Sequence, residues 1–179
     1  MAQRGGDVQS HLRIADGPIH SDLVSFGGAD IILSVEPLES LRYLPYLKPS
    51  GWLVTNVTPV KNIATYPEMK EILARLDALP RRLVLDADTL AAESGNRRGM
   101  NMVLAGAAAP FLGFSFERLE EGVRTVFESK GSEVVAANLK ALSAGRNFSE
   151  SILESPGGSG GSGGSAQAGT AAGTAAGAP

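Results

Sequence analysis

Polar side chains with hydroxyl, amide or carboxylate groups follow three short apolar segments of this chain. They are Ser34 and Glu36 after the first segment, Thr55 and Asn56 after the second, and Asp86 and Asp88 after the third. Such groups can orient a ligand by hydrogen bonds, and a carboxylate can also exchange a proton with it. If the segments are parallel strands, their ends meet at one edge of a sheet, and we expect these side chains to line one crevice there.

A structural role for the same residues is the alternative. A loop that enters a helix needs Ser, Thr, Asp or Asn as a cap, whatever the protein does. We favour capping for Asp86 and Asp88, and both roles stay open for Glu36 and Asn56. The sequence has no recognisable Ser/His/Asp or Cys/His constellation, metal-ligand cluster, dinucleotide fingerprint or Walker-type loop.

The first residues form a second candidate region. Glycines let backbone amides approach a phosphate, so Arg4-Gly5-Gly6 can form an anion-binding turn, although the pattern by itself favours a tight turn before an exposed strand. His11 and Arg13 share the polar face of the segment that follows. We interpret His11 as a surface or interface residue rather than a catalytic base.

Two asparagines, Asn101 and Asn138, each interrupt an apolar helical face. A buried amide has to find hydrogen-bond partners, so each asparagine is either a structural pin or a contact to another chain. We favour the structural role for both.

The elements that would position these residues are those of an α/β domain. Three apolar runs, at 31–33, 52–54 and 83–85, are typical of strands buried on both faces of a parallel sheet. We therefore expect a mostly parallel sheet with flanking helices, a Rossmann-like three-layer arrangement. Helical spacing of apolar residues predicts the helices, which lie at 65–79, 88–95, 100–109, 115–127 and 134–145.

The start of the chain has a different pattern. Val8, Leu12 and Ile14 alternate with polar neighbours, which is the period of a strand with one apolar face. Asp16-Gly17-Pro18 is a turn signal, and residues 19–24 can return as a second strand. We therefore expect a β-hairpin before the parallel units.

Composition excludes several classes of function. The chain has 179 residues with a net charge of −3, so it lacks the basic character of a nucleic-acid-binding protein. It has no cysteine, and therefore it cannot form a disulfide or ligate an iron–sulfur cluster through thiolates. No apolar run is long enough to span a bilayer and no signal-peptide pattern is present, so we expect a cytoplasmic protein with no membrane or nucleic-acid partner.

The composition changes near Pro156, where the chain becomes uncharged and consists mainly of Gly, Ser and Ala. Such a segment buries too little apolar area to offset the entropy of ordering it. We expect one folded domain at 1–148 and a disordered Gly/Ser/Ala-rich tail at 149–179.

Several stretches of the chain resemble the gamma-type domain of the 2-oxoacid:ferredoxin oxidoreductases. They are "MAQRGGDVQSHLRI", "ADIILSVEPLESLRYLPYLKPSGWLVTN", "YPEMKEIL", "DADTLAAESGN", "NMVLAGAAAPFL" and "KGSEVVAANLKALSAG". The order of the Gln-Arg-Gly-Gly turn, the Ser-Val-Glu-Pro-x-Glu turn and the Asn-Leu-x-Ala-Leu helix makes the resemblance specific. It covers 1–146, and within the family it is strongest to the branch that acts on aryl pyruvates.

The resemblance implies a subunit without a cofactor of its own. In that family a catalytic partner subunit binds thiamine diphosphate and iron–sulfur clusters, a 2-oxoacid is oxidatively decarboxylated, coenzyme A takes the acyl group and ferredoxin accepts the electrons. The present chain is then expected to assemble with that alpha-type subunit in a hetero-oligomer and to wall its site. The candidate wall residues are Arg4, Gly5, Gly6, His11, Arg13, Ser34, Glu36, Asn56 and Asn101.

The chain also departs from the family pattern. Relatives have a strand, a Gly-x-Gly-Gly-Gln-Gly loop and a helix before the Gln-Arg-Gly-Gly turn, so we expect the first strand and helix of the domain to be missing here. Pyruvate, 2-oxoglutarate and branched-chain 2-oxoacids remain alternative substrates of the same kind of complex. A stand-alone module that binds a small molecule, or an inactive fragment, is the alternative outside such a complex.

Overall fold

A parallel sheet lies at the centre of the computed structural model, which describes residues 8–61 and 65–154. In these residues the strands are β1 (Ala29–Ser34), β2 (Leu47–Asn56) and β3 (Arg82–Leu85), in the order β1-β2-β3. Their cores are the three apolar runs identified in the sequence. β2 is the central strand, and its Leu53 and Val54 have no exposed surface.

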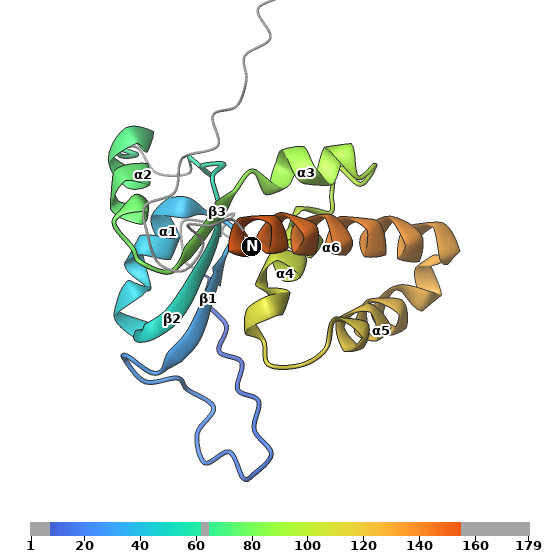
Figure 1. Cartoon of the computed structure of the whole chain (residues 1–179), viewed down its shortest axis with the longest axis horizontal. Coiled ribbons are helices and arrows are strands. Elements are labelled where there is room, and N and C mark those ends of the chain that lie inside the picture. The colour runs from blue at the N-terminus through green and yellow to red at the C-terminus, as the bar shows by residue number, and fades with distance from the viewer. Residues whose placement is uncertain (1–7, 62–64, 155–179) are drawn as a thin grey trace, which may run out of the picture.

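Helices cover both faces of this sheet (Figure 1). They are α1 (Pro37–Arg42), α2 (Met69–Asp77), α3 (Ala87–Glu93), α4 (Met100–Ala108), α5 (Phe116–Phe127) and α6 (Ser132–Leu153). One face of the sheet packs against α1 and α2 through an apolar cluster that includes Leu53 and Leu76. The other face packs against α3, α4 and α6 through a cluster that includes Val54 and Leu104. The predicted α/β fold with a parallel sheet between flanking helices is therefore confirmed.

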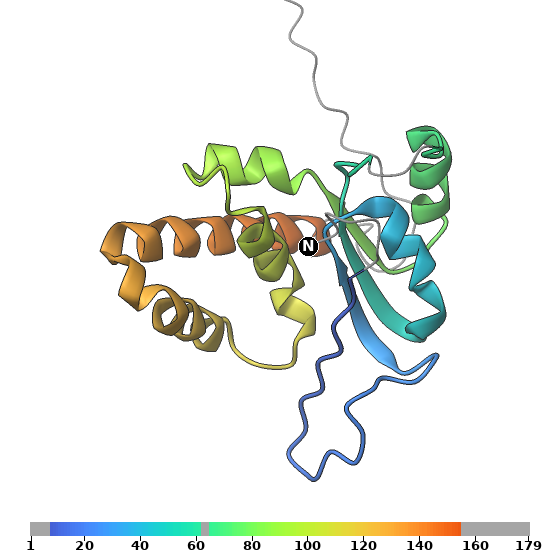
Figure 2. The same cartoon turned by 180° about the vertical axis from the view of Figure 1, so that it is seen from behind.

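The long helix α6 and helix α5 form a helical hairpin that extends away from the sheet (Figure 2). Short 3-10 turns connect or precede several elements, at Leu44–Tyr46, Ala109–Phe111 and Glu128–Lys130. No helix within the described part of the chain combines the length and the apolar character needed to cross a membrane.

Helices α4 and α6 cross at two glycines. A Cβ on Gly106 would lie 1.8 Å from the carbonyl oxygen of Leu142, and a Cβ on Gly145 would lie 1.8 Å from the carbonyl oxygen of Val103. Only glycine permits this approach of two backbones. The expectation that Gly145 ends the last helix is therefore wrong, because this glycine is a packing contact inside α6, which continues to Leu153.

The domain boundary expected at residue 148 also moves. Residues 149–153 continue α6 rather than starting the tail, because the last turns of this helix still pack against the domain. Ser149 has no exposed surface, and its hydroxyl donates to the carbonyl oxygen of Arg146 at 2.9 Å. The remainder of the expected tail, from residue 155, lies outside the described residues.

The β-hairpin expected at residues 8–24 is not formed. The chain does reverse direction, since the Arg13 guanidinium donates to the carbonyl oxygen of Ser21 at 2.7 Å and the Val24 amide donates to Nδ1 of His11 at 2.8 Å. Both contacts use a side chain, whereas a hairpin needs backbone groups paired with each other. Alternation of apolar and polar residues makes a strand possible, but a strand forms only where a second backbone pairs with it.

Candidate functional site

The ends of the three strands bring the predicted polar residues to one edge of the sheet, as expected. Ser34 pairs in register with Thr55 on β2, and Asn56 pairs with Leu85 on β3. Glu36 and Asp86 follow directly as the N-caps of α1 and α3. This group of side chains, which we call the carboxyl-edge cluster, contains Ser34, Glu36, Asn56, Tyr66, Asp86 and Asp88.

Glu36 is the centre of the cluster. Its side chain is 7% exposed, and one carboxylate oxygen accepts the Glu39 amide at 2.7 Å as the cap of α1. The other oxygen accepts the Tyr66 hydroxyl and, at 3.4 Å, the Val60 amide. A buried carboxylate needs such donors to offset the loss of its hydration. Glu36 thus fixes both the start of α1 and the segment after β2.

Tyr66 was not among the residues singled out from the sequence. The pKa of the Tyr66 phenol is raised well above its ordinary value. The largest cause is the partial burial of the phenol, and its hydrogen bond to Glu36 and the negative charge of that carboxylate add to the effect. The phenol is therefore a stable donor to Glu36. The sequence signal that could have found it is the need of a buried glutamate for a donor, but that need does not say which of the distant residues supplies it.

Asn56 connects the end of β2 to the start of α3. Its side-chain oxygen accepts the Ala87 amide at 3.0 Å, and its side-chain nitrogen donates to Asp88 at 2.9 Å. Asp86 accepts the Thr89 amide at 2.9 Å and caps the same helix. Capping is therefore confirmed for Asp86, whereas Asp88 serves as the acceptor for Asn56, which is 1% exposed.

Ser34 closes the loop between β1 and α1. Its hydroxyl donates to the carbonyl oxygen of Glu36 at 2.7 Å and accepts the Glu36 amide at 3.3 Å. The strand-to-helix turn is thus locked by a side chain two residues before the cap. The cluster as a whole is a set of mutually satisfied hydrogen bonds, which suits a rigid rim better than a reacting group.

His11 and Arg13 lie away from this cluster. The His11 ring meets Tyr46 edge-on with centroids 5.6 Å apart, and Tyr46 precedes β2 at the edge where the strands begin. The segment before β1, to which Arg13 belongs, forms a loop that extends beyond that edge (Figure 1). The structure therefore separates these two residues from Ser34, Glu36 and Asn56.

The two asparagines differ in position. Asn138 is 8% exposed, donates to the Val134 carbonyl oxygen at 2.8 Å and accepts from Asn96 at 3.3 Å, so its role as a structural pin is confirmed. Asn101 is exposed, so the expectation of a buried amide is wrong. It lies in the first turn of α4, where the helix has not yet entered the core. Arg4, Gly5 and Gly6 lie outside the described residues.

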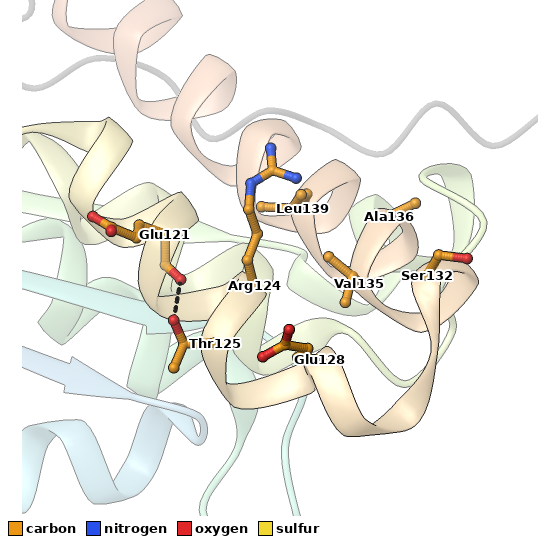
Figure 3. A pocket seen from close by; sticks show the side chains of 8 residues that line it. All are labelled: Glu121, Arg124, Thr125, Glu128, Ser132, Val135, Ala136 and Leu139. Atoms are coloured by element: carbon orange, nitrogen blue, oxygen red, sulfur yellow. Dashed lines mark hydrogen bonds between the residues drawn. The ribbon is translucent and has the colours of Figure 1, made fainter.

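A groove of about 560 Å³ lies between α5 and α6 (Figure 3). Val135, Ala136 and Leu139 supply its apolar lining from α6, and Glu121 and Arg124 are among the charged residues of its rim. None of the predicted site residues that the structure describes lines it. The groove lies on the helical hairpin, away from the carboxyl-edge cluster, and the described residues around it include no group of three His, Asp or Glu side chains that could hold a metal ion.

Two of the ligand sets used by cofactors of the family that the chain resembles are lacking in the residues that the structure describes. The whole sequence has no cysteine for an iron–sulfur cluster. Within residues 8–61 and 65–154, no three His, Asp or Glu side chains are grouped to hold a metal ion such as the one that accompanies a diphosphate.

Comparison with known protein families identifies the family of this chain. Residues 1–148 match the family described as pyruvate ferredoxin/flavodoxin oxidoreductase. The chain belongs to this family. The resemblance identified from the motifs is thereby confirmed at the level of the family, and the match extends into α6.

Curated relatives in this family are named as subunits of an oxidoreductase. The chain is 35% identical over 156 residues to an indolepyruvate oxidoreductase subunit IorB of Archaeoglobus fulgidus, covering 82% of this chain and 75% of the relative. It is 36% identical over 163 residues to the protein of the same name in Pyrococcus horikoshii, covering 86% and 79%. The Thermococcus kodakarensis protein is also 36% identical, over 164 residues.

A solved structure has a similar fold. It is a 2-oxoglutarate:ferredoxin oxidoreductase from Magnetococcus marinus with 2-oxoglutarate, coenzyme A and succinyl-CoA bound. The TM-score is 0.54 at 20% identity, and the match covers 76% of the present chain. The chain corresponds to only 22% of that longer chain, so the likeness supports the fold and no more.

Proposed function

We propose that this chain is the subunit without cofactors of an indolepyruvate (arylpyruvate) ferredoxin oxidoreductase. The observation that carries the proposal is the 35–36% identity to curated proteins named indolepyruvate oxidoreductase subunit IorB over more than four fifths of the chain. The reaction is the oxidative decarboxylation of the 2-oxoacid to an acyl-CoA, with the electrons passed to ferredoxin. The proposal includes a cytoplasmic location.

The cofactors belong to a second subunit in this proposal. Thiamine diphosphate stabilises the carbanion that forms when carbon dioxide leaves, iron–sulfur clusters carry the electrons, and coenzyme A accepts the acyl group. The present chain has neither thiolates nor a described carboxylate cluster for these groups. Its contribution is to pack against the catalytic subunit, exclude water from the site and keep one wall of it in place.

We assign this wall to the carboxyl edge of the sheet, where ligands of open α/β sheets bind. Ser34, Glu36 and Asn56 keep the loops at this edge rigid, because their polar atoms are engaged with neighbouring backbone and side chains. They are positioning residues in this proposal. A change at Glu36 is expected to reduce turnover through a displaced wall, with little effect on the chemistry that the partner performs.

Reconstitution tests the proposal. The chain is combined with the thiamine-diphosphate-binding subunit from the same organism, and the coenzyme A-dependent reduction of ferredoxin is measured with indolepyruvate, pyruvate, 2-oxoglutarate and 3-methyl-2-oxobutanoate. We expect activity only when both subunits are present, and the highest kcat/KM with indolepyruvate. Preference for another of these oxoacids would overturn the substrate, and full activity of the catalytic subunit alone would overturn the assigned role.

Glu36→Gln supplies the residue-level test. The amide keeps the size of the side chain but loses one acceptor for the Glu39 amide or the Tyr66 hydroxyl. Turnover of the reconstituted complex should fall several-fold, whereas Glu71→Gln, an exposed substitution on α2, should leave it unchanged. Equal rates for the wild type and Glu36→Gln would reduce Glu36 to a helix cap.

A further inference from the structure

Side chains hold the segment before β1 in its folded-back course. We call residues 8–26 the N-terminal arm, with an outgoing half at 8–14 and a returning half at 19–24 (Figure 1). The Arg13 guanidinium donates to the carbonyl oxygens of Ser21 at 2.7 Å and Leu23 at 3.5 Å, and the Val24 amide donates to Nδ1 of His11 at 2.8 Å. No backbone–backbone hydrogen bond between described residues involves positions 8–24. Among these residues, closure of the arm therefore depends on the side chains of Arg13 and His11.

The contact between His11 and Val24 requires a neutral imidazole. Nδ1 accepts the Val24 amide through its lone pair, so the ring proton is on Nε2. In a protonated histidine both ring nitrogens are donors. The Nδ1 proton and the Val24 amide proton would then point at each other across 2.8 Å. Protonation of His11 thus replaces a hydrogen bond with a contact between two donors.

Protonation also places a second positive charge beside Arg13. Side chains two positions apart in an extended segment lie on the same face, and both His11 and Arg13 contact the returning half from that face. Like charges at this separation repel each other. Acid therefore weakens the contact made by Arg13 as well as the one made by His11.

The element that packs on the His11 ring contributes no competing charge. Tyr46 meets this ring edge-on with centroids 5.6 Å apart, and its phenol is a neutral group near neutral pH. Lys48, two positions further along, is the nearest cation of that segment in sequence, and it is paired with Asp30. A carboxylate that would stabilise a charged His11 is therefore not supplied from this side by any described ion pair.

The arm itself has two acidic residues. Asp22 is in the returning half and Asp16 is nearer the tip, where His20 also lies. No ion pair between described residues joins either carboxylate to His11 or Arg13. Carboxylates and guanidinium groups keep their charge between about pH 5 and pH 8, whereas histidine changes charge in this range. His11 is thus the group whose charge changes at the contact that closes the arm.

We propose that His11 is a pH-sensitive switch for the N-terminal arm. The neutral imidazole keeps the arm closed, and its protonation, as the pH falls from about 8 to about 5, opens the arm. Opening is confined to residues 8–24, because the base of the arm is held by contacts that do not titrate in this range. There the Gly27 amide donates to the carbonyl oxygen of Pro45 at 2.9 Å, and Phe26 packs on Tyr46 with ring centroids 4.6 Å apart.

Paired spin labels measure the opening. The chain has no cysteine, so Ser10→Cys combined with Ile19→Cys gives one exposed labelling site in each half of the arm. Double electron–electron resonance on the full chain gives the distribution of distances between the labels at pH 7.5 and pH 5.0. We expect one narrow, short distance at pH 7.5 and a broad, longer distribution at pH 5.0. The ratio of open to closed arms should rise at least tenfold, and an unchanged distribution would overturn the inference.

Two variants of His11 separate the acceptor from the aromatic ring. In His11→Asn, the side-chain oxygen stands close to the position of Nδ1 and accepts the Val24 amide at either pH, so the arm should stay closed at both. In His11→Phe, a ring remains to pack on Tyr46 but the acceptor is lost, so the arm should be open at both. A closed arm in His11→Phe, or a pH response in His11→Asn, would contradict the switch.

His20 supplies the control, because it is the other histidine of the chain. His20→Asn should respond to pH as the wild type does, and loss of the response would move the switch to His20 and overturn the role of His11. Circular dichroism at both pH values checks that the domain stays folded; unfolding of the whole domain at pH 5.0 would also overturn a local switch. These measurements use this chain alone, so their outcome is independent of the proposed function.

Discussion

Substitution of Gly145 by alanine is the sharpest test of the packing between α4 and α6. The added Cβ would lie 1.8 Å from the Val103 carbonyl oxygen and 2.8 Å from the Ala107 amide nitrogen. Both are backbone atoms, so no side-chain rotation can relieve the contact. To reach even 3.0 Å from the oxygen, the two helices must separate by about 1.2 Å, provided that the movement is along the contact.

The expected magnitude follows from two opposing effects. Alanine favours a helix over glycine by about 1 kcal/mol, which would stabilise α6. Against this, a separation of 0.5–1 Å forfeits a quarter to a half of the dispersion energy of each contact across the interface. The α4 side of that interface is fully buried, at Val103, Leu104, Ala107 and Ala108. We expect a net loss of about 2–3 kcal/mol in the free energy of unfolding, in the upper part of the usual range for overpacked cores.

Gly122 provides the matched control. It lies inside α5, and a Cβ there meets nothing within 4 Å. Gly122→Ala should therefore raise the free energy of unfolding by about 0.5–1 kcal/mol. Urea denaturation of both variants, followed by circular dichroism at the helix band, measures the two changes. A Gly145→Ala variant as stable as Gly122→Ala would refute the close crossing of α4 and α6.

Three further changes test other parts of the structure. Tyr66→Phe should lower the free energy of unfolding by about 1 kcal/mol at neutral pH. Because the pKa of the Tyr66 phenol is raised in the folded protein, the wild type should lose stability as the pH rises above about 10. Urea denaturation at a series of pH values should show a smaller loss in the variant. Asn56→Ala should lower the free energy of unfolding by about 2–3 kcal/mol, because it leaves the buried Ala87 amide without its acceptor. Asp86→Ala removes an exposed helix cap and should lower it by about 1 kcal/mol. Similar values for both variants would contradict the difference in burial. Deletion of 156–179 should leave the Tm unchanged, whereas deletion of 149–179 should lower it by several degrees in a thermal melt, since it removes buried Ser149.

Sequence patterns predicted the structure correctly where residues close together in the sequence determine it. The apolar runs at 31–33, 52–54 and 83–85 form strands because continuous β-compatible residues suit a sheet covered on both faces. Capping of α3 by Asp86 was also predictable, since the acceptor and the Thr89 amide are three residues apart. Parallel order then brought Ser34, Glu36 and Asn56 to one edge.

The same patterns failed where the conformation or burial of a residue depends on a partner that is distant in the sequence. Gly145 is a common kind of helix terminator, but here it is a contact that only the approach of α4 makes necessary. Residues 8–14 alternate like a strand and form none, because the returning segment at 19–24 meets them through the side chains of Arg13 and His11 and not through paired backbone groups. Asn101 shares an apolar stretch with buried neighbours, yet its place in the first turn of α4 leaves it exposed.

The sequence by itself determined the family, the α/β class and the absence of thiolate chemistry, because motif order, hydrophobic period and cysteine count are properties of the chain alone. The tertiary structure decided that Glu36 receives the hydroxyl of Tyr66, thirty positions away, and that His11 lies at the opposite edge of the sheet. It also decided that two glycines hold α4 against α6. Such pairings depend on which surfaces meet when the layers pack, and spacing along the chain carries no record of that.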